Sequence, residues 1–493
     1  MIRFEKKTWF ARSLREVERI GSNVVLREGR AKKKTGSPWE PIEEAKTTEH
    51  PFPHVHAARR FVLETMSRWK AEGYEEAPRT SHQPSSAPSE PYLAKCNPVL
   101  EEEILREGTS SAAIHVLADW LMMEGDPKGA LIQEMIRADE ERDLAKKQIC
   151  EEQALALLWR TPMQDRPYVM GSDIRKKLKE AYDGGRISLS WRAGFVDSCW
   201  IEGSQSDLRT RDHSFDLEFM IGHLFENHSF SLLRKLVIVP SGPLVAHDTL
   251  LGILFGISDE ALNAAQENRL PILSFPTSLR CLAVEMENDY GEGVIDVERC
   301  YSRLPNLKEL TLSGMEGVQL GRAIALPKLQ ALSLEPRILT GANIQSLVSS
   351  ALPNLERLRL CFFDAHEWEE SDFTVRDLVP LFETKSLPSL KYLELWGTMP
   401  SDDDFDMLEA LLASPLLRQL STLSLRSYFF HTVEMANACL DLFIRNRDKL
   451  AHLDVLDLSK DATWAQWFPE SATDPKVAKR AAELRSLATK VLL

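Results

Sequence analysis

The sequence lacks the features that mark several large classes of protein. Seven cysteines are scattered over 493 residues without a Cys-x-x-Cys pair, which argues against both a disulfide framework and a zinc knuckle. The longest clearly apolar stretch, at 250–257, is too short to span a bilayer, and the first residues lack the apolar segment of a signal peptide. We therefore expect a cytoplasmic protein that does not enter a membrane.

An excess of positive charge is also missing. The chain has 60 Lys and Arg against 74 Asp and Glu, so its net charge of −14 makes it a poor nonspecific ligand of nucleic acid. Residues 1–80 are the exception, because Lys and Arg outnumber Asp and Glu there. Candidate nucleic-acid contacts are therefore confined to a basic turn and its surroundings: Arg27, Arg30, Lys32, Lys33, Lys34 and Trp39, whose ring is able to stack on a base.

Motifs of enzyme active sites are absent as well. The sequence has no nucleophile elbow, no His-Glu-x-x-His and no complete Rossmann fingerprint. The histidines of "HPFPHVH", residues 50–56, lie in a proline-containing loop with no further ligand at a metal-site spacing. The sequence therefore predicts a protein without enzymatic activity, metal or cofactor. A buried pocket that held His366 of "DAHEWEESD" against facing carboxylates would favour an enzyme instead.

Residues 1–79 have the pattern of a small α+β domain. We expect a strand at "NVVLREGR", a basic turn at "AKKKTGSPW" and a helix at 55–74. This part resembles the WGR domain of poly(ADP-ribose) polymerases and of many bacterial proteins, since Gly29 and Arg30 match the end of its motif and Gly73 and Tyr74 close the helix. The resemblance implies DNA contact. However, Glu28 stands in place of the motif's Trp, and a carboxylate repels phosphate. The sequence therefore leaves open whether this domain binds DNA.

A Ser- and Pro-rich stretch at 80–91 is expected to be a flexible linker, followed by a helical domain at 92–203. In that domain "LADWLMMEGDPKGALIQEM" resembles the short repeat-companion domain of bacterial leucine-rich-repeat proteins, and "WRAGFVDSCWIEG" resembles the strand that often follows it. A Gly-rich turn before a helix is able to bind an anion, but this one lacks the spacer and the ending of a P-loop. We predict a corner in which Gly125 ends one helix, Asp126 caps the next and Pro127 opens it.

Eight L-x-x-L-x-L segments recur, starting at 231, 277, 305, 327, 353, 388, 418 and 451. One strand per repeat with variable returns is typical of a leucine-rich-repeat solenoid, so the predicted fold class is α/β. The Asn or Cys that usually follows the last strand leucine is missing, which predicts an irregular solenoid without an asparagine ladder. The expected bounds are 204–475, with a capping helix at 476–493.

In such a solenoid the residues between the leucines face outward on the concave side. Arginine, tyrosine and tryptophan, which are typical of interface hot spots, gather there on three adjacent strands. The candidate partner-binding residues are Arg357, Arg359, Tyr392, Glu394, Trp396 and Arg426. The alternative for this face is a solvated sheet with cross-strand ion pairs such as that between Arg359 and Glu394.

The sequence thus predicts a non-catalytic recognition or scaffold protein of bacterial type, which binds another macromolecule, most simply a protein, through the concave face. The alternative is a nucleic-acid-binding adaptor in which the WGR-like domain contacts DNA while the repeats recruit a partner. The two hypotheses differ in one respect that is measurable, because DNA binding through the basic turn depends steeply on salt. The sequence carries no signal for oligomeric state.

Overall fold

A computed structural model of the chain divides into two compact units, residues 1–89 and residues 90–493. The structure describes the strands of the first unit and several residues between 61 and 76. In the second unit it describes residues 94–107, 112–160, 178–183, 186–202, 224–225, 227–239, 275–286, 294–362, 373, 375–397, 404–427, 433–458, 475–484 and 490–492. The predicted linker at 80–91 lies outside the described residues.

The first unit contains an antiparallel sheet. Its strands lie in the order β4-β3-β2-β1-β5 and are β1 (Ile2–Lys7), β2 (Arg12–Ile20), β3 (Asn23–Ala31), β4 (Glu43–Pro51) and β5 (Glu75–Glu76). The predicted strand "NVVLREGR" lies within β3. Trp69 and Thr65 are buried in this unit.

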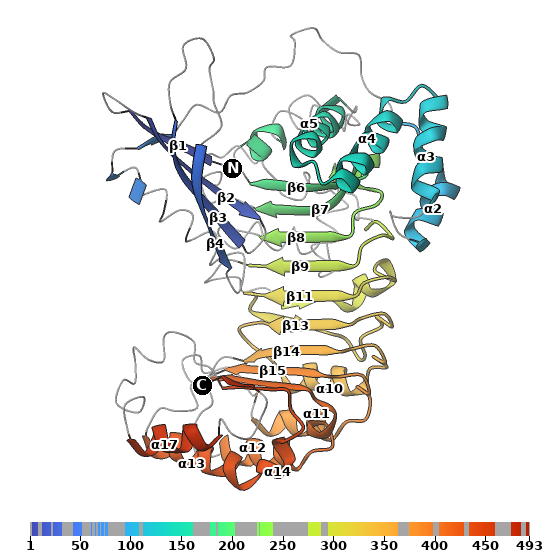
Figure 1. The fold of residues 1–493 in the computed structure, drawn as a ribbon. Coiled ribbons are helices and arrows are strands. Elements are labelled where there is room, and N and C mark those ends of the chain that lie inside the picture. Colours follow the sequence, from blue (N-terminus) through green and yellow to red (C-terminus); the bar gives the residue numbers. More distant parts are fainter. Residues whose placement is uncertain are drawn as a thin grey trace, which may run out of the picture. The chain divides into compact units, whose positions relative to one another are not determined.

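The second unit is built on a sheet of eleven strands, so the expected mixed α/β class is confirmed at the level of a large, mostly parallel sheet (Figure 1). The sheet follows chain order, and only the hairpin of β6 and β7 is antiparallel. Its strands are β6 (Ile187–Arg192), β7 (Phe195–Glu202), β8 (Lys235–Val239), β9 (Cys281–Glu285), β11 (Glu309–Ser313), β13 (Ala331–Glu335), β14 (Arg357–Phe362), β15 (Tyr392–Gly397), β16 (Thr422–Ser427), β17 (Val455–Asp457) and β18 (Lys490–Leu492). Each of the eight L-x-x-L-x-L segments contains one of these strands, from β8 to β17.

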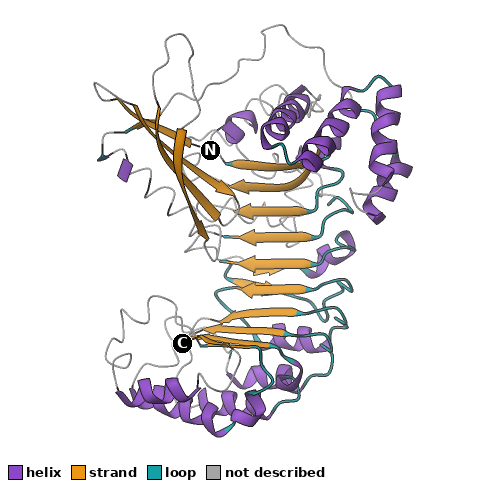
Figure 2. Cartoon of the chain, in the orientation of Figure 1, coloured by secondary structure: helices purple, strands orange, loops and turns teal. Residues whose placement is uncertain are grey.

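Helices precede the sheet and join its later strands (Figure 2). Before β6 the described helices include α2 (Pro98–Glu107), α3 (Ala112–Met123), α4 (Pro127–Glu141) and α5 (Leu144–Arg160). Among the strands from β13 onward the described helices include α10 (Gly341–Ser349), α11 (Val379–Glu383), α12 (Asp404–Ala413), α13 (Val433–Arg445), α14 (Arg447–Leu450) and α17 (Pro475–Leu484). The predicted helices at "ANIQSLVSSAL" and "DDDFDMLEALLAS" correspond to α10 and α12.

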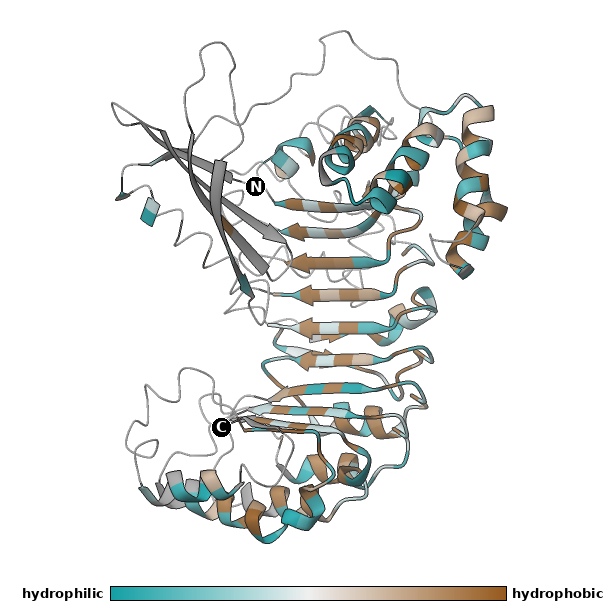
Figure 3. Ribbon diagram, viewed as in Figure 1, coloured by the Kyte–Doolittle hydropathy of each residue, from teal (hydrophilic) through white to brown (hydrophobic). Residues whose placement is uncertain are grey.

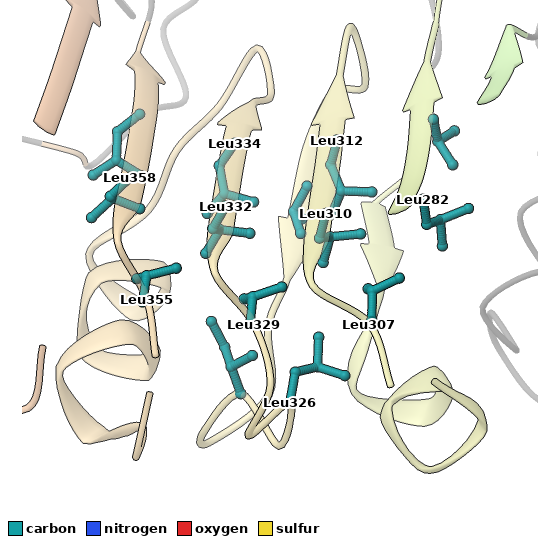
Figure 4. Close-up of a cluster of buried hydrophobic side chains, with 14 of the residues drawn as sticks. Leu282, Leu307, Leu310, Leu312, Leu326, Leu329, Leu332, Leu334, Leu355 and Leu358 are labelled. Carbon is teal, nitrogen blue, oxygen red and sulfur yellow. The ribbon is translucent and has the colours of Figure 1, made fainter. Parts of the chain in front are cut away.

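The core is a stack of leucines from successive strands. Leu310, Leu332 and Leu358 occupy one rung of the sheet, and all are at most 2% exposed. Figure 4 shows these side chains beside Leu307, Leu329 and Leu355, which precede the same strands. Burying one such side chain contributes about 1.5–3 kcal/mol. Apolar and polar residues alternate along these strands (Figure 3). Because each strand exposes its leucines until a neighbour covers them, stability comes from stacking.

Hydrogen bonds at the strand starts take the place of the missing asparagine ladder. The residue just before the first leucine of a segment donates its side chain to a backbone carbonyl of the preceding segment. The pairs are Ser278 to Ser231 O (3.0 Å), Asn306 to Thr277 O (2.9 Å), Asn354 to Pro327 O (2.8 Å) and Ser389 to Pro353 O (2.5 Å). At the corresponding position of later segments, Gln419 Nε2 donates to Leu387 O at 2.7 Å and His452 Nε2 lies 2.8 Å from Leu417 O, whereas Lys328 Nζ donates to Asn306 Oδ1 at 2.6 Å. These contacts tie neighbouring repeats together at the end of the strands opposite to the one where an asparagine ladder is expected.

The elements differ from the expected ones at two boundaries, and one small sheet was not expected. The sheet continues across the expected boundary at 203/204, because β7 pairs directly with β8. The predicted C-terminal helix at 476–493 ends at Leu484. Residues of β18 instead pair with β17, and this pairing provides hydrogen-bond partners for backbone groups of β17 that would otherwise be unpaired at the edge of the sheet. A small parallel sheet of β10 (Val294–Asp296) and β12 (Gly317–Gln319) was not predicted, since three-residue strands carry too short a pattern.

Candidate functional site

The sheet has a second face, which is formed by the residues that alternate with the core leucines; we call it the polar face. Strand register aligns the six predicted partner-binding residues on it. Arg357 lies opposite Tyr392, Arg359 opposite Glu394, and Trp396 opposite Arg426. The alternation of strands β14, β15 and β16 therefore brings these positions together as predicted. For Arg426 the structure describes the strand position but not the side chain.

Arg359 is the organising residue of this group. Its Nη1 lies 3.2 Å from Glu335 Oε1 on one neighbouring strand, and its Nε lies 3.4 Å from Glu394 Oε1 on the other. The second pair lacks hydrogen-bond geometry and is held by charge alone. The guanidinium carbon also lies 5.4 Å from the centre of the Trp396 ring, within the range of a cation–π contact.

Glu394 is withdrawn from solvent, which changes its expected role. Its side chain is 5% exposed, and its Oε2 accepts a hydrogen bond from the Tyr392 hydroxyl. A carboxylate in this position holds Arg359 and Tyr392 in place and has little surface left to offer to a partner. The ion pair of Arg359 and Glu394 that the alternative hypothesis expected is present, but at a buried place on the face rather than a solvated one.

Arg357 is the exposed member of the group. Its side chain is 57% exposed and reaches over Ala331 of the intervening strand to Glu309, with Nη2 2.8 Å from Oε1. Such an exposed pair contributes only about 0–1 kcal/mol, so a partner is able to compete for either charge at little cost.

The remaining outward positions of these strands are less open than the pattern predicts. Cys361 is buried between the larger side chains of Glu335 and Trp396 on the adjacent strands, and Ser424 and Asp457 are buried too. Burial, reinforced by the carboxylates of Glu335 and Glu394, raises the pKa of Cys361 well above its ordinary value. The thiol therefore stays protonated at neutral pH and is a poor nucleophile.

The candidate nucleic-acid contacts lie in the first unit. Arg27 and Arg30 are in β3, where Arg27 pairs in register with Glu16 and Arg30 with Ser13. The pairing of β3 with β4 shifts by one residue between Glu28 and Arg30, so that two residues of β4, Glu44 and Ala45, lie opposite Gly29. Lys32, Lys33, Lys34 and Trp39 lie outside the described residues, as do His54, His56 and His366.

The Gly-Asp-Pro-Lys-Gly turn is a corner, as predicted. Gly125 has a φ of 74°, and Asp126 caps α4 by accepting a hydrogen bond from the backbone N–H of Lys128 at 2.8 Å. Its other carboxylate oxygen accepts from the backbone N–H of Lys95, which precedes α2, at 2.9 Å. A Cβ on Gly129 would come within 2.5 Å of Ala118 O, so glycine permits the close packing of α3 on α4. The N–H groups that an anion would need are thus used by Asp126.

The same turn contains a buried lysine that sequence reasoning missed. Lys128 is 2% exposed, and its Nζ lies 3.6 Å from the centre of the Phe195 ring with no hydrogen-bond partner among the described residues. Burial lowers the pKa of Lys128 from 10.5 to about 7, although the charges of Glu101 and Asp126 oppose the shift. The sequence pattern of a lysine directly after a capping Asp-Pro predicts a solvated side chain. In the structure β7 covers this lysine with Phe195.

A second contact fastens α2 beside this lysine. His228 Nε2 lies 2.7 Å from Glu101 Oε1, and the His228 ring meets Phe195 edge to face with centroids 5.7 Å apart. Burial opposes ionisation of Glu101, but the hydrogen bond and charge of His228 outweigh it, so the pKa of Glu101 is lowered. The cluster joins three helical or turn segments to β7 and has the character of a structural clamp.

Among the described residues, no three His, Cys, Asp or Glu side chains are grouped in a way that would hold a metal ion. None of the described helices combines the length and the apolar character needed to cross a membrane.

Comparison with known proteins adds little to this geometry. No family model matches the sequence, and no curated protein is similar to it. The chain is similar to a Bacteroides fragilis protein of known crystal structure at 14% identity, over 99% of this chain and 95% of that one, with a TM-score of 0.40. At that TM-score the similarity supports no conclusion about fold or function. The structure itself shows an α/β protein of two compact units with a large, mostly parallel sheet.

Proposed function

We propose that the chain is a non-catalytic recognition protein that binds another protein through the polar face at β14 and β15. The observation that carries the proposal is the pre-organised group around Arg359, in which an arginine is fixed between two carboxylates and beside an aromatic ring. Rigid aromatic and arginine side chains lose little conformational freedom on binding and dominate interface energies. Within the group, Arg357 and Trp396 are the contact residues, and Glu394 positions the others.

Finer architecture enters the same proposal. We infer that the large sheet belongs to an irregular leucine-rich-repeat solenoid, supported by one strand per L-x-x-L-x-L segment and by the stacked leucines. The α3–α4 corner supports the resemblance to a repeat-companion domain. The first unit, in which Gly29 and Arg30 lie within β3, is proposed to be WGR-like, and no described contact favours its use in DNA binding.

A pull-down from native lysate with the full chain tests the protein-binding proposal. The test variant combines Arg357→Gln with Trp396→Leu, which removes the charge and the ring while keeping apolar volume beside Arg359. Arg445→Gln is the matched control, because Arg445 is exposed on α13 and has the same charge change. We expect one protein that survives nuclease treatment, is retained by the control and is lost with the double variant.

Two results would contradict the proposal. Capture that is equal for the wild type and the double variant would remove the polar face from recognition. Capture of nucleic acid alone, lost when Lys32, Lys33 and Lys34 are changed to Gln and weakening steeply with salt, would favour the adaptor hypothesis instead.

A further inference from the structure

Three consecutive strands of the large sheet are preceded by a basic side chain at the same position. Arg234, Arg280 and Lys308 come immediately before β8, β9 and β11. The backbone places them side by side, since Arg280 N donates to Arg234 O at 2.8 Å and Lys308 N donates to Arg280 O at 2.7 Å. With neighbouring strands about 4.8 Å apart, three positive charges originate within roughly 10 Å. We call these residues, together with the exposed Lys235 that follows Arg234, the basic row.

The basic row is poorly compensated within the protein. Asp197 Oδ1 pairs with Arg234 Nε at 2.6 Å, but Arg280 donates only to the backbone carbonyls of Thr277 (2.9 Å) and Leu279 (3.2 Å) among the described residues. Lys308 is exposed and forms no ion pair within the described part of the chain. Burial, and next the charge of Arg234, lower the pKa of Arg280.

This arrangement concentrates positive charge on the surface of the protein. Like charges on adjacent strands repel each other, and nothing in the packing of the leucine core requires a basic residue at these positions. The chain as a whole has a net charge of −14, so the row is a local exception rather than part of a generally basic surface. A surface of one sign of charge attracts ligands of the opposite sign, here an anion.

We propose that the basic row binds a short acidic segment of a partner protein, with carboxylates bridging Arg280 to its neighbours Arg234 and Lys308. The guanidinium fork matches a carboxylate in shape and donor spacing. The width of the row favours a short peptide over a nucleic acid. On one side it ends at Asp197, whose carbonyl accepts from Arg234 N, and on the other it passes through Gln330 to Glu356, so a long polyanion would run onto carboxylates.

This inference uses residues other than those of the polar-face proposal, and it stands or fails separately. The probe is a fluorescein-labelled peptide of twelve residues in which Glu alternates with Ser, and its counterpart has Gln in place of Glu. Fluorescence anisotropy with the full chain measures binding at low and at physiological ionic strength. The test variant is Arg280→Gln with Lys308→Gln. Lys391→Gln is the control, because Lys391 occupies the same position before β15 but follows Glu356 on the adjacent strand.

We expect the Glu peptide to bind and the Gln peptide not to bind. The double variant should lose affinity at least tenfold, and Lys391→Gln should bind as the wild type does. Lys308→Gln alone removes no described contact, so it should weaken binding without lowering the melting temperature. This single variant distinguishes loss of binding from loss of folding. The proposal is overturned if the Glu peptide does not bind at low ionic strength or binds the double variant equally well. It is also overturned if single-stranded oligothymidylate of matched charge binds the row more tightly than the peptide.

Discussion

Replacing Lys128 with methionine should remove a specific pH dependence of stability. In the folded protein burial lowers the pKa of Lys128 from 10.5 to about 7, whereas the unfolded chain keeps the ordinary value. Between these two values the unfolded state binds more protons, so the free energy of unfolding rises with pH by about 1.4 kcal/mol per unit. From pH 7.5 to pH 9 this amounts to about 2 kcal/mol. The Phe195 ring favours the ammonium form and so works against the lowering of the pKa by burial.

Methionine keeps the length and apolar stem of lysine, so Lys128→Met retains the packing against Phe195 but has no proton to lose. We expect the variant to be more stable than the wild type at pH 7.5, and the difference to shrink by about 2 kcal/mol by pH 9. Buried thiols such as Cys300, whose pKa burial raises to about 12, make the protein less stable as the pH rises and so oppose the effect of Lys128. They are the same in both proteins, so their contribution cancels in the difference between variant and wild type.

The measurement is a urea series equilibrated at each pH. A short deuterium pulse at one fixed pH follows, and mass spectrometry of peptides from α3 and α4 gives the exchange. This readout is local, which matters because a chain of two compact units need not unfold in one step. A difference between variant and wild type that stays constant over this pH range would refute the buried, titrating lysine.

Further substitutions test the packing and polar contacts. Gly129→Ala should destabilise the α3–α4 corner by about 1–3 kcal/mol, because the added Cβ would meet backbone atoms. Gly125→Ala adds a Cβ in open space and should cost only about 1 kcal/mol of backbone strain. Urea unfolding of the two variants compares these costs. Asn354→Ala should cost about 1 kcal/mol by thermal or urea unfolding, and no loss would remove the inter-repeat hydrogen bonds from the stability account. Arg359→Met should cost roughly 1.5–3 kcal/mol, since it leaves Glu394 buried without its cation, and adding Glu394→Gln should restore part of the loss in a double-mutant cycle.

The strands and their register were predictable because the leucine spacing has one consistent interpretation. Once Leu310, Leu332 and Leu358 are aligned on adjacent strands, the residues that alternate with the leucines in each strand are assigned to the polar face. The α3–α4 corner was predictable for the same kind of reason, since Gly125, Asp126 and Pro127 each have a local conformational preference that does not depend on the rest of the fold.

Burial by distant segments was not predictable from the pattern. Glu394 and Cys361 occupy outward positions by alternation, yet both are buried, because side chains of neighbouring strands cover them. Lys128 is buried by β7, some seventy residues later in the chain. The basic row did have a signal in the sequence, namely Arg or Lys directly after the first leucine of three successive segments, but its meaning depends on the strands being adjacent.

The central claim is that the polar face at β14 and β15 is the recognition surface. Hydrogen exchange of the full chain, alone and in complex with the purified protein that it captures, tests this claim most directly. The account predicts slower exchange in peptides that cover Arg357–Phe362 and Tyr392–Gly397, with no change in α13. Protection confined to β3 and β4 of the first unit, or to α13, with no change in β14 and β15, would contradict it.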